Sequence, residues 1–75
     1  MDQIDVGKRI KYLRINKLKM SQEDFALKVG IDRTYLCKIE SGKKNLTLET
    51  INKMCDGLEM TIQEFFNTKI DEMEN

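Results

Sequence analysis

The stretch that decides the fold is SQEDFALKVGIDRTYLCKIE, residues 21–40. Its first residue, Ser21, is an N-cap residue, because its hydroxyl can accept a hydrogen bond from a backbone N–H in the following turn. Three apolar residues then follow at helical spacing: Phe25, Ala26 and Val29. Gly30 allows the left-handed backbone that ends a helix, and Asp32 is the N-cap candidate of the next one. The stretch therefore predicts two short helices separated by a turn at Gly30.

The second of these helices is expected over residues 33–41, with Leu36 and Ile39 turned inward. A small residue such as Ala26 suits a place where two helices cross closely, since a larger side chain would overpack the crossing. Two helices joined by a short glycine turn form a helix-turn-helix, in which the second helix enters the major groove of DNA. We interpret residues 21–41 as such a motif.

Apolar spacing and caps predict three more helices. The first runs from residue 4 to about 17, with Asp5 as its N-cap and Val6, Ile10 and Leu13 as inner positions. A helix begins after Thr47, and its inner positions are Leu48, Ile51, Met54 or Cys55, and Leu58. Thr61 and Glu64 form a capping box for a last helix over residues 61–72. The sequence thus predicts an all-α protein, a compact five-helix bundle that forms one domain over residues 1–75.

The composition excludes several classes. No apolar run approaches the roughly 18 residues that a membrane span needs, and the N-terminus lacks the layout of a signal peptide, so we expect a cytoplasmic protein without a membrane partner. The chain has no His and two cysteines, Cys37 and Cys55. We therefore expect no metal, no cofactor and two free thiols that act as small buried hydrophobes. Without His, paired carboxylates or a glycine-rich phosphate loop, we expect no enzyme and no small-molecule substrate.

Charge is distributed unevenly along the chain. Residues 1–45 contain eleven Lys or Arg and six Asp or Glu, a net charge of +5, whereas residues 46–75 contain two Lys and seven acidic residues, a net charge of −5. The overall net charge of zero hides this difference. Such a chain can present a basic face to phosphate and an acidic end away from it.

The pattern resembles the Cro and lambda-repressor-like helix-turn-helix family over residues 6–66. The residues that carry the resemblance are Ile10, Leu13, Arg14, Ser21, Gln22, Glu23, Phe25, Ala26, Gly30, Ile31, Leu36, Ile39, Glu40, Gly42, Leu48, Ile51 and Leu58. Within this family, the segments SQEDFA and GIDRTYLCKIESGKKNLTLETI are most similar to the controller proteins of restriction-modification systems, which are small dimeric regulators. Similar segments also occur in prophage regulators. The resemblance implies a sequence-specific transcriptional regulator that binds an operator in double-stranded DNA.

Four residues near the start of the two central helices are candidates for DNA contact. Gln22 lies where the unpaired N–H groups of a helix attract phosphate, and the resemblance implies that it clamps the DNA backbone. Arg33 can donate two hydrogen bonds to guanine. Thr34 can contact a thymine methyl group or a phosphate. Tyr35 can press on the DNA backbone or lie half-buried against the preceding helix.

A second set of candidates is basic or amide-bearing and follows in the chain: Lys38, Lys43, Lys44 and Asn45. These are expected to contact phosphates, which fixes the register of the protein without reading sequence, although Lys44 can also reach a base. Arg14 and Glu40 differ, because the resemblance places them in contact as a partly buried ion pair. We assign this pair to the fold.

We expect the protein to form a homodimer through apolar residues of the last helix. Phe65 and Phe66 cannot both face inward, since adjacent helical residues point about 100° apart. One is expected in the core, and the other, with Ile62 or Ile70, forms the interface with a second subunit. Two subunits would read two half-sites on DNA. The alternative is a prophage-type repressor or an antitoxin-type subunit that neutralises a partner protein.

Overall fold

The computed structural model describes residues 3–67, and the side chains of residues 5–67. Within that part of the chain the predicted all-α architecture is confirmed, and no strand is present. The helices are α1 (Gln3–Asn16), α2 (Gln22–Val29), α3 (Arg33–Glu40), α4 (Leu48–Gly57) and α5 (Ile62–Asn67). The part of the last helix that the sequence predicts beyond residue 67 lies outside the described residues.

The predicted signals at the ends of α2 are confirmed. The hydroxyl of Ser21 accepts from the backbone N–H of Asp24 at 3.0 Å. Gly30 has φ +86°, and its N–H donates to the carbonyl of Ala26 at 2.8 Å. This left-handed residue ends α2, and the chain then turns into α3. Glycine suits the position because an L side chain is disfavoured in this conformation.

Caps also fix the starts of α4 and α5. Thr47 accepts from the N–H of Thr50 at 3.2 Å. In the predicted capping box, the N–H of Thr61 donates to the Glu64 carboxylate at 2.9 Å, and the N–H of Glu64 donates to the Thr61 hydroxyl at 3.0 Å. One predicted N-cap is wrong and another is confirmed in position, since Asp32 is the N-cap residue of α3. The side chain of Asp32 forms no cap hydrogen bond, and Asp5 lies inside the first turn of α1, because that helix already begins at Gln3.

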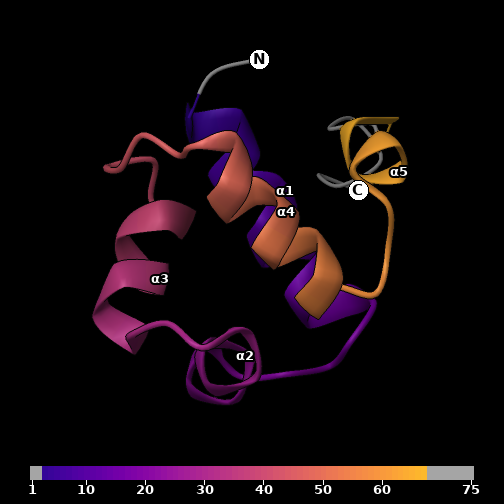
Figure 1. The fold of residues 1–75 in the computed structure, drawn as a ribbon. Coiled ribbons are helices and arrows are strands. Elements are labelled where there is room, and N and C mark those ends of the chain that lie inside the picture. The colour runs from indigo at the N-terminus through magenta and orange to yellow at the C-terminus, as the bar shows by residue number, and fades with distance from the viewer. Residues whose placement is uncertain (1–2, 68–75) are drawn as a thin grey trace.

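The helices pack so that α3 lies at the edge of the bundle. α3 contacts α1 and α2, α2 also contacts α4, and α4 contacts α5. In Figure 1, α2 and α3 lie at one side of the molecule and α5 lies at the other. This arrangement leaves the outer face of α3 open to a ligand and keeps it apart from the last helix.

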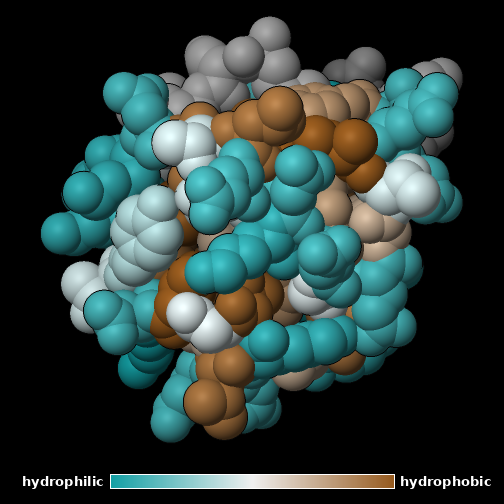
Figure 2. Space-filling model, viewed as in Figure 1, coloured by the Kyte–Doolittle hydropathy of each residue, from teal (hydrophilic) through white to brown (hydrophobic). Residues whose placement is uncertain are grey.

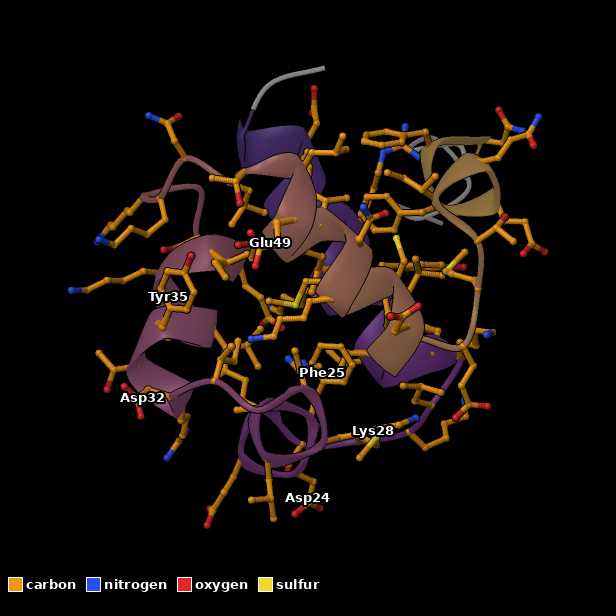
Figure 3. The ribbon with its side chains drawn as sticks, viewed as in Figure 1. Asp24, Phe25, Lys28, Asp32, Tyr35 and Glu49 are labelled. Atoms are coloured by element: carbon orange, nitrogen blue, oxygen red, sulfur yellow. The ribbon has the colours of Figure 1, made fainter. Side chains whose placement is uncertain are left out.

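The core is built from apolar side chains of all the helices. Its buried hydrophobic members are Val6, Ile10, Leu13, Phe25, Ala26, Val29, Leu36, Ile39, Met54, Cys55, Leu58 and Phe65. Figure 3 shows Phe25 pointing between the helices, while Asp24, its neighbour, points away from the molecule. Leu48 was predicted to face inward, but its side chain is 64% exposed. It stands at the first position of α4.

The crossing of α1 and α3 is close because of Gly7. A Cβ atom at this position would overlap the backbone carbonyl oxygen of Ile39. The sequence does not reveal the role of Gly7, since an isolated glycine within a helical pattern does not show which other helix passes over it. The backbone contact brings the C-terminal half of α3 against α1.

Two basic residues near the N-terminus act in the fold: Arg9 of α1 and Lys17, which directly follows α1. Arg9 is buried, and its guanidinium donates to the carbonyl of Phe65 at 3.2 Å, which joins α1 to α5. The ammonium group of Lys17 donates to the carbonyls of Leu58 at 2.5 Å and Glu59 at 2.9 Å. A cation suits this place, because the C-terminal end of α4 carries unpaired carbonyls and partial negative charge.

Candidate nucleic-acid interface

One shallow groove joins the start of α2 to the exposed face of α3. It encloses about 320 Å³, and we name it the α3 groove; it is lined by Gln22, Arg33, Thr34, Cys37 and Lys38. The four α3 residues are all exposed. Their spacing places them on one face of the helix, since residues three and four apart are neighbours on a helical surface. The structure therefore brings together four of the predicted DNA contacts and adds Cys37.

Cys37 was predicted to be buried, and this prediction is wrong. Cys55 is buried as expected, whereas Cys37 is exposed. Free cysteine is in general among the most buried residue types, and Cys37 departs from this preference. The helical spacing predicts its exposure better, because Cys37 follows Arg33 by four residues and so lies on the same face of the helix.

Basic side chains extend the α3 groove toward the next loop. Arg33 and Lys38 belong to the groove itself, and Lys43 and Lys44 are exposed in the connection to α4. This connection folds back on α3, because the N–H of Lys43 donates to the carbonyl of Lys38 at 2.9 Å. Gly42, with φ +78°, makes the reversal possible. The hydrogen bond to Lys38 brings the backbone of Lys43 next to the end of α3, and Lys44 and Asn45 follow as exposed residues of the loop.

Behind the groove lies a buried ion pair. The Nε of Arg14 donates to Glu40 Oε2 at 2.8 Å, and another guanidinium nitrogen donates to Oε1 at 3.0 Å. A third donates to the carbonyl of Met20 at 2.7 Å. Both side chains are buried. The structure therefore contains the pair that the resemblance implied, and the Arg14 guanidinium is buried in contacts within the protein.

The same carboxylate holds Gln22. The amide Nε2 of Gln22 donates to Glu40 Oε1 at 3.0 Å, and the side chain is half-buried. A carboxylate only accepts hydrogen bonds, so the nitrogen and not the oxygen of the amide must face Glu40. The amide oxygen and the second N–H take no part in this bond, and the Gln22 side chain lines the α3 groove. The arrangement fixes a polar side chain at the N-terminus of α2, where backbone N–H groups favour an anion.

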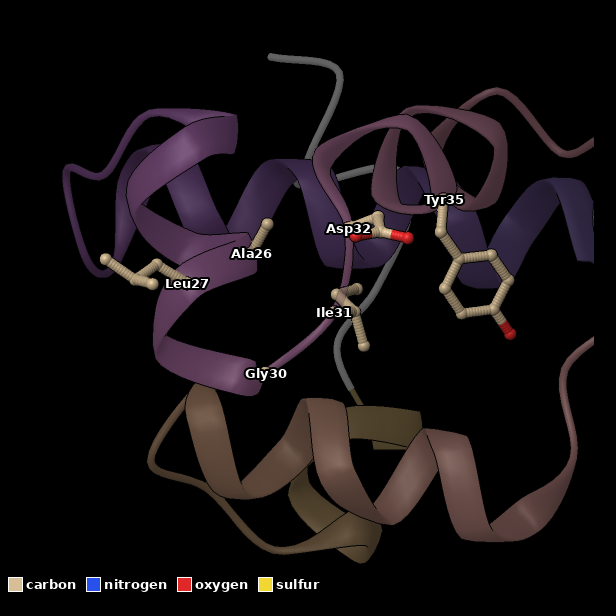
Figure 4. Close-up of a pocket in the computed structure, with 6 residues that line it drawn as sticks. All are labelled: Ala26, Leu27, Gly30, Ile31, Asp32 and Tyr35. Carbon is tan, nitrogen blue, oxygen red and sulfur yellow. The ribbon is translucent and has the colours of Figure 1, made fainter.

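Tyr35 lies outside the α3 groove. It is half-buried against the core, as in the second of its two predicted placements. It lines a separate depression of about 430 Å³ with Ala26, Leu27, Gly30, Ile31 and Asp32. Figure 4 shows the Tyr35 ring and Leu27 at opposite ends of this depression. Tyr35 therefore stands at the border between the exposed face of α3 and the turn.

The predicted dimer residues fall into three groups. Phe65 is fully buried. It is therefore the phenylalanine of the pair that fills the core of this chain, and it does not belong to the predicted dimer interface. Phe66 is 37% exposed, and its ring meets that of Phe65 edge to face at 5.2 Å between centroids. Ile62 is half-buried, and Ile70 lies outside the described residues. Figure 2 shows hydrophobic side chains interrupting the hydrophilic surface over the start of α4 and toward α5.

Residues 3–67 contain no cluster of three or more His, Cys, Asp or Glu side chains that could hold a metal ion. Over the same residues, none of the helices has both the length and the apolar character that crossing a membrane requires.

The fold and the α3 groove define a helix-turn-helix protein whose second helix presents an exposed basic face. Comparison with known proteins agrees, since residues 10–65 match the helix-turn-helix family. The chain is 42% identical over 64 residues to the control protein C.MunI of a Mycoplasma species, which spans 85% of this chain and 86% of that protein. It is 36% identical to the control protein C.BamHI of Bacillus amyloliquefaciens over 69% of this chain and 64% of the relative.

Solved structures give the same result. The restriction-modification controller protein C.AhdI from Aeromonas hydrophila matches with a TM-score of 0.78 and 34% identity, over 85% of this chain and 96% of that one. The controller protein C.Esp1396I, solved as a tetramer with its natural 35 base-pair operator, matches with a TM-score of 0.83 and 37% identity, over 97% and 95% of the two chains. The protein belongs to the helix-turn-helix family of restriction-modification controller proteins.

Proposed function

We propose that this protein binds a specific operator sequence in double-stranded DNA as a homodimer and regulates transcription as the controller of a restriction-modification system. The observation that carries the proposal is the α3 groove, in which Gln22 at the start of α2 and the exposed cations Arg33 and Lys38 of α3 line one surface. The relative C.Esp1396I was solved on its operator, and this supports DNA as the ligand. The proposed function includes no catalytic activity.

In this function the base reader is Arg33. It is exposed at the first position of α3, and the N-terminal residues of a recognition helix are those that reach base edges in the major groove. Its guanidinium fits the O6 and N7 atoms of guanine through two hydrogen bonds, which distinguish guanine by roughly 1–3 kcal/mol. Thr34 stands beside it and contacts a thymine methyl group or a phosphate.

The remaining contacts hold the DNA backbone. Lys38, Lys43 and Lys44 lie close together around the end of α3, so their charges add over one stretch of phosphates. Asn45 extends this set as a neutral donor. Gln22 donates its second amide N–H to a phosphate at the other end of the groove, and Tyr35 packs on the backbone beside α3. Phosphate contacts fix the register of the protein, and Arg33 then reads the sequence.

The second subunit docks on apolar residues of α5 and α4 that are exposed or half-buried. Phe66 and Ile62 belong to α5, and Leu48, which the sequence analysis had placed in the core, adds a third apolar side chain on α4. The pairing lets two α3 helices meet successive half-sites about one turn of DNA apart. Sedimentation of a Phe66→Asp variant should give the monomer mass where the unmodified protein gives the dimer mass; an unchanged mass would place the interface elsewhere.

A mobility-shift assay with the DNA upstream of the gene itself tests the function. We expect a shift at low salt that weakens as salt rises, because each phosphate neutralised by a Lys or Arg adds about 0.9 to the slope of log affinity against log salt. If binding is absent at low salt, or if its affinity does not change with salt, the result would contradict the phosphate contacts on which the proposal rests.

A further inference from the structure

We propose that Cys37 is a specificity-determining residue that contacts base edges in the major groove, where its thiol favours the methyl group of thymine. The inference rests on the proposed function, since it assigns a further reader to the same DNA-binding surface. The proposed function assigns a DNA contact to each of the other residues that line the α3 groove. Cys37 has no charge and only a weak hydrogen-bond donor, so it has no assigned contact yet.

The position of Cys37 carries the first step. It is exposed and lines the groove together with Arg33, Thr34 and Lys38. It follows Arg33 by four residues and Thr34 by three, so its side chain occupies the neighbouring place along the same helical face. If Arg33 reaches a base edge, the next turn of the helix passes over the adjacent base pairs. A duplex seated against Arg33 and Lys38 therefore covers Cys37.

The chemistry of the thiol carries the second step. Cysteine behaves as a small hydrophobe with a weak S–H donor, so it offers little to the donors and acceptors of a base edge. A polar base atom facing it would lose water without gaining a good hydrogen bond. The C5-methyl group of thymine needs no such partner, and the major groove displays it. Thymine is thus the base that Cys37 favours.

Cys55 provides a reference within the same chain. Its side chain is 2% exposed in the core. Burial, and after it the nearby Asp56 carboxylate, raises the pKa of the Cys55 thiol. Because the thiolate is the nucleophile, a neutral buried thiol reacts slowly. In the folded protein an alkylating reagent should therefore report on Cys37 alone.

The first experiment measures alkylation by N-ethylmaleimide in the unmodified protein, free and saturated with a duplex that the protein has selected from a random-sequence pool. We expect Cys37 to react in the free protein and at least about tenfold more slowly in the complex, while Cys55 reacts only after urea is added. Equal rates at Cys37 with and without bound duplex would overturn the inference and leave DNA binding intact. Failure to select any duplex would instead remove the proposed function.

The second experiment tests the choice of base. Each thymine of the selected half-site is replaced by uracil, which lacks only the methyl group. For the unmodified protein we expect one such position to weaken binding about fourfold, as for one buried methyl group (about 0.8 kcal/mol). In Cys37→Ser this position should lose its effect, while circular dichroism shows the same helix content. If every thymine position behaves alike in the two proteins, Cys37 reads no thymine.

Discussion

The side-chain amide of Gln22 donates to Glu40 across 3.0 Å, which ties the first residue of α2 to the last residue of α3. The same carboxylate is held by Arg14 of α1. The polar group proposed to meet phosphate is therefore oriented before DNA arrives. An oriented donor loses less conformational entropy on binding than a free glutamine side chain, so its hydrogen bond contributes more to affinity.

Replacing Gln22 with Ala tests this role. We expect affinity to fall about tenfold on specific and random duplexes alike, since a hydrogen bond to a charged group contributes roughly 1.5 kcal/mol and a phosphate carries no sequence information. Fluorescence anisotropy with both duplexes measures the change, and Gln63→Ala on α5 is the matched control. A loss confined to particular base pairs would show that Gln22 reads bases instead.

The ion pair of Arg14 and Glu40 should dominate stability near the groove. Either Arg14→Met or Glu40→Leu leaves one buried charge without its partner, which costs about 3–5 kcal/mol in the free energy of unfolding. The double variant removes both charges and should recover a large part of that loss, although the carbonyl of Met20 loses its donor. Urea denaturation measures all three variants. Single variants within about 1 kcal/mol of the unmodified protein would contradict a structural role for the pair.

Two glycines should respond to Ala for different reasons. Gly7→Ala forces a Cβ atom into the backbone of α3, and backbone cannot move aside as a flexible side chain does. We expect a loss of about 3 kcal/mol, at the upper end for overpacking. Gly30→Ala meets no atom within 4 Å and suffers only from its φ of +86°, which costs about 1 kcal/mol. The reverse order of stability in urea would refute the close crossing of α1 and α3.

Acid should weaken the start of α5 through Glu64. The N–H and the hydroxyl of Thr61 lower the pKa of this carboxyl below its ordinary value of 4.5. Because the folded pKa is depressed, the stabilisation is fully present above about pH 4.5 and is lost as the pH falls through the folded pKa. The melting temperature of Glu64→Gln should lie below that of the unmodified protein at pH 7, and the difference should shrink at pH 3. A constant difference would disprove the linkage.

The sequence predicted the helices well because local chemistry sets them. The Ser21 cap, the Gly30 turn and the capping box of Thr61 with Glu64 all depend on residues a few positions apart. The errors concern contacts between distant segments. Arg9 is one of several basic residues in the first predicted helix, and nothing in that helix indicates that its guanidinium is buried and donates to the carbonyl of Phe65. Burial of this kind depends on how helices pack, which no short pattern encodes.

The candidate site divides in the same way. Arg33, Thr34 and Lys38 were predicted from one helix, and the structure places them along one groove. Cys37 was missed because an average preference for burial outweighed its helical position. The bond from Gln22 to Glu40 joins residues of two helices, and only the fold shows it. The pattern of charged and polar residues therefore predicted which residues line the α3 groove. Only the packing of the helices shows that the Gln22 side chain is held by Glu40.

The central claim is that the exposed face of α3 reads a DNA sequence through Arg33. The most direct test measures the ratio of affinities for a selected duplex and a random duplex in Arg33→Ala, with Lys43→Ala as the matched control. We predict that Arg33→Ala lowers this ratio at least about tenfold at particular guanines, whereas Lys43→Ala weakens both duplexes equally and reduces the salt slope by about 1. Equal losses on both duplexes for Arg33→Ala would contradict the claim.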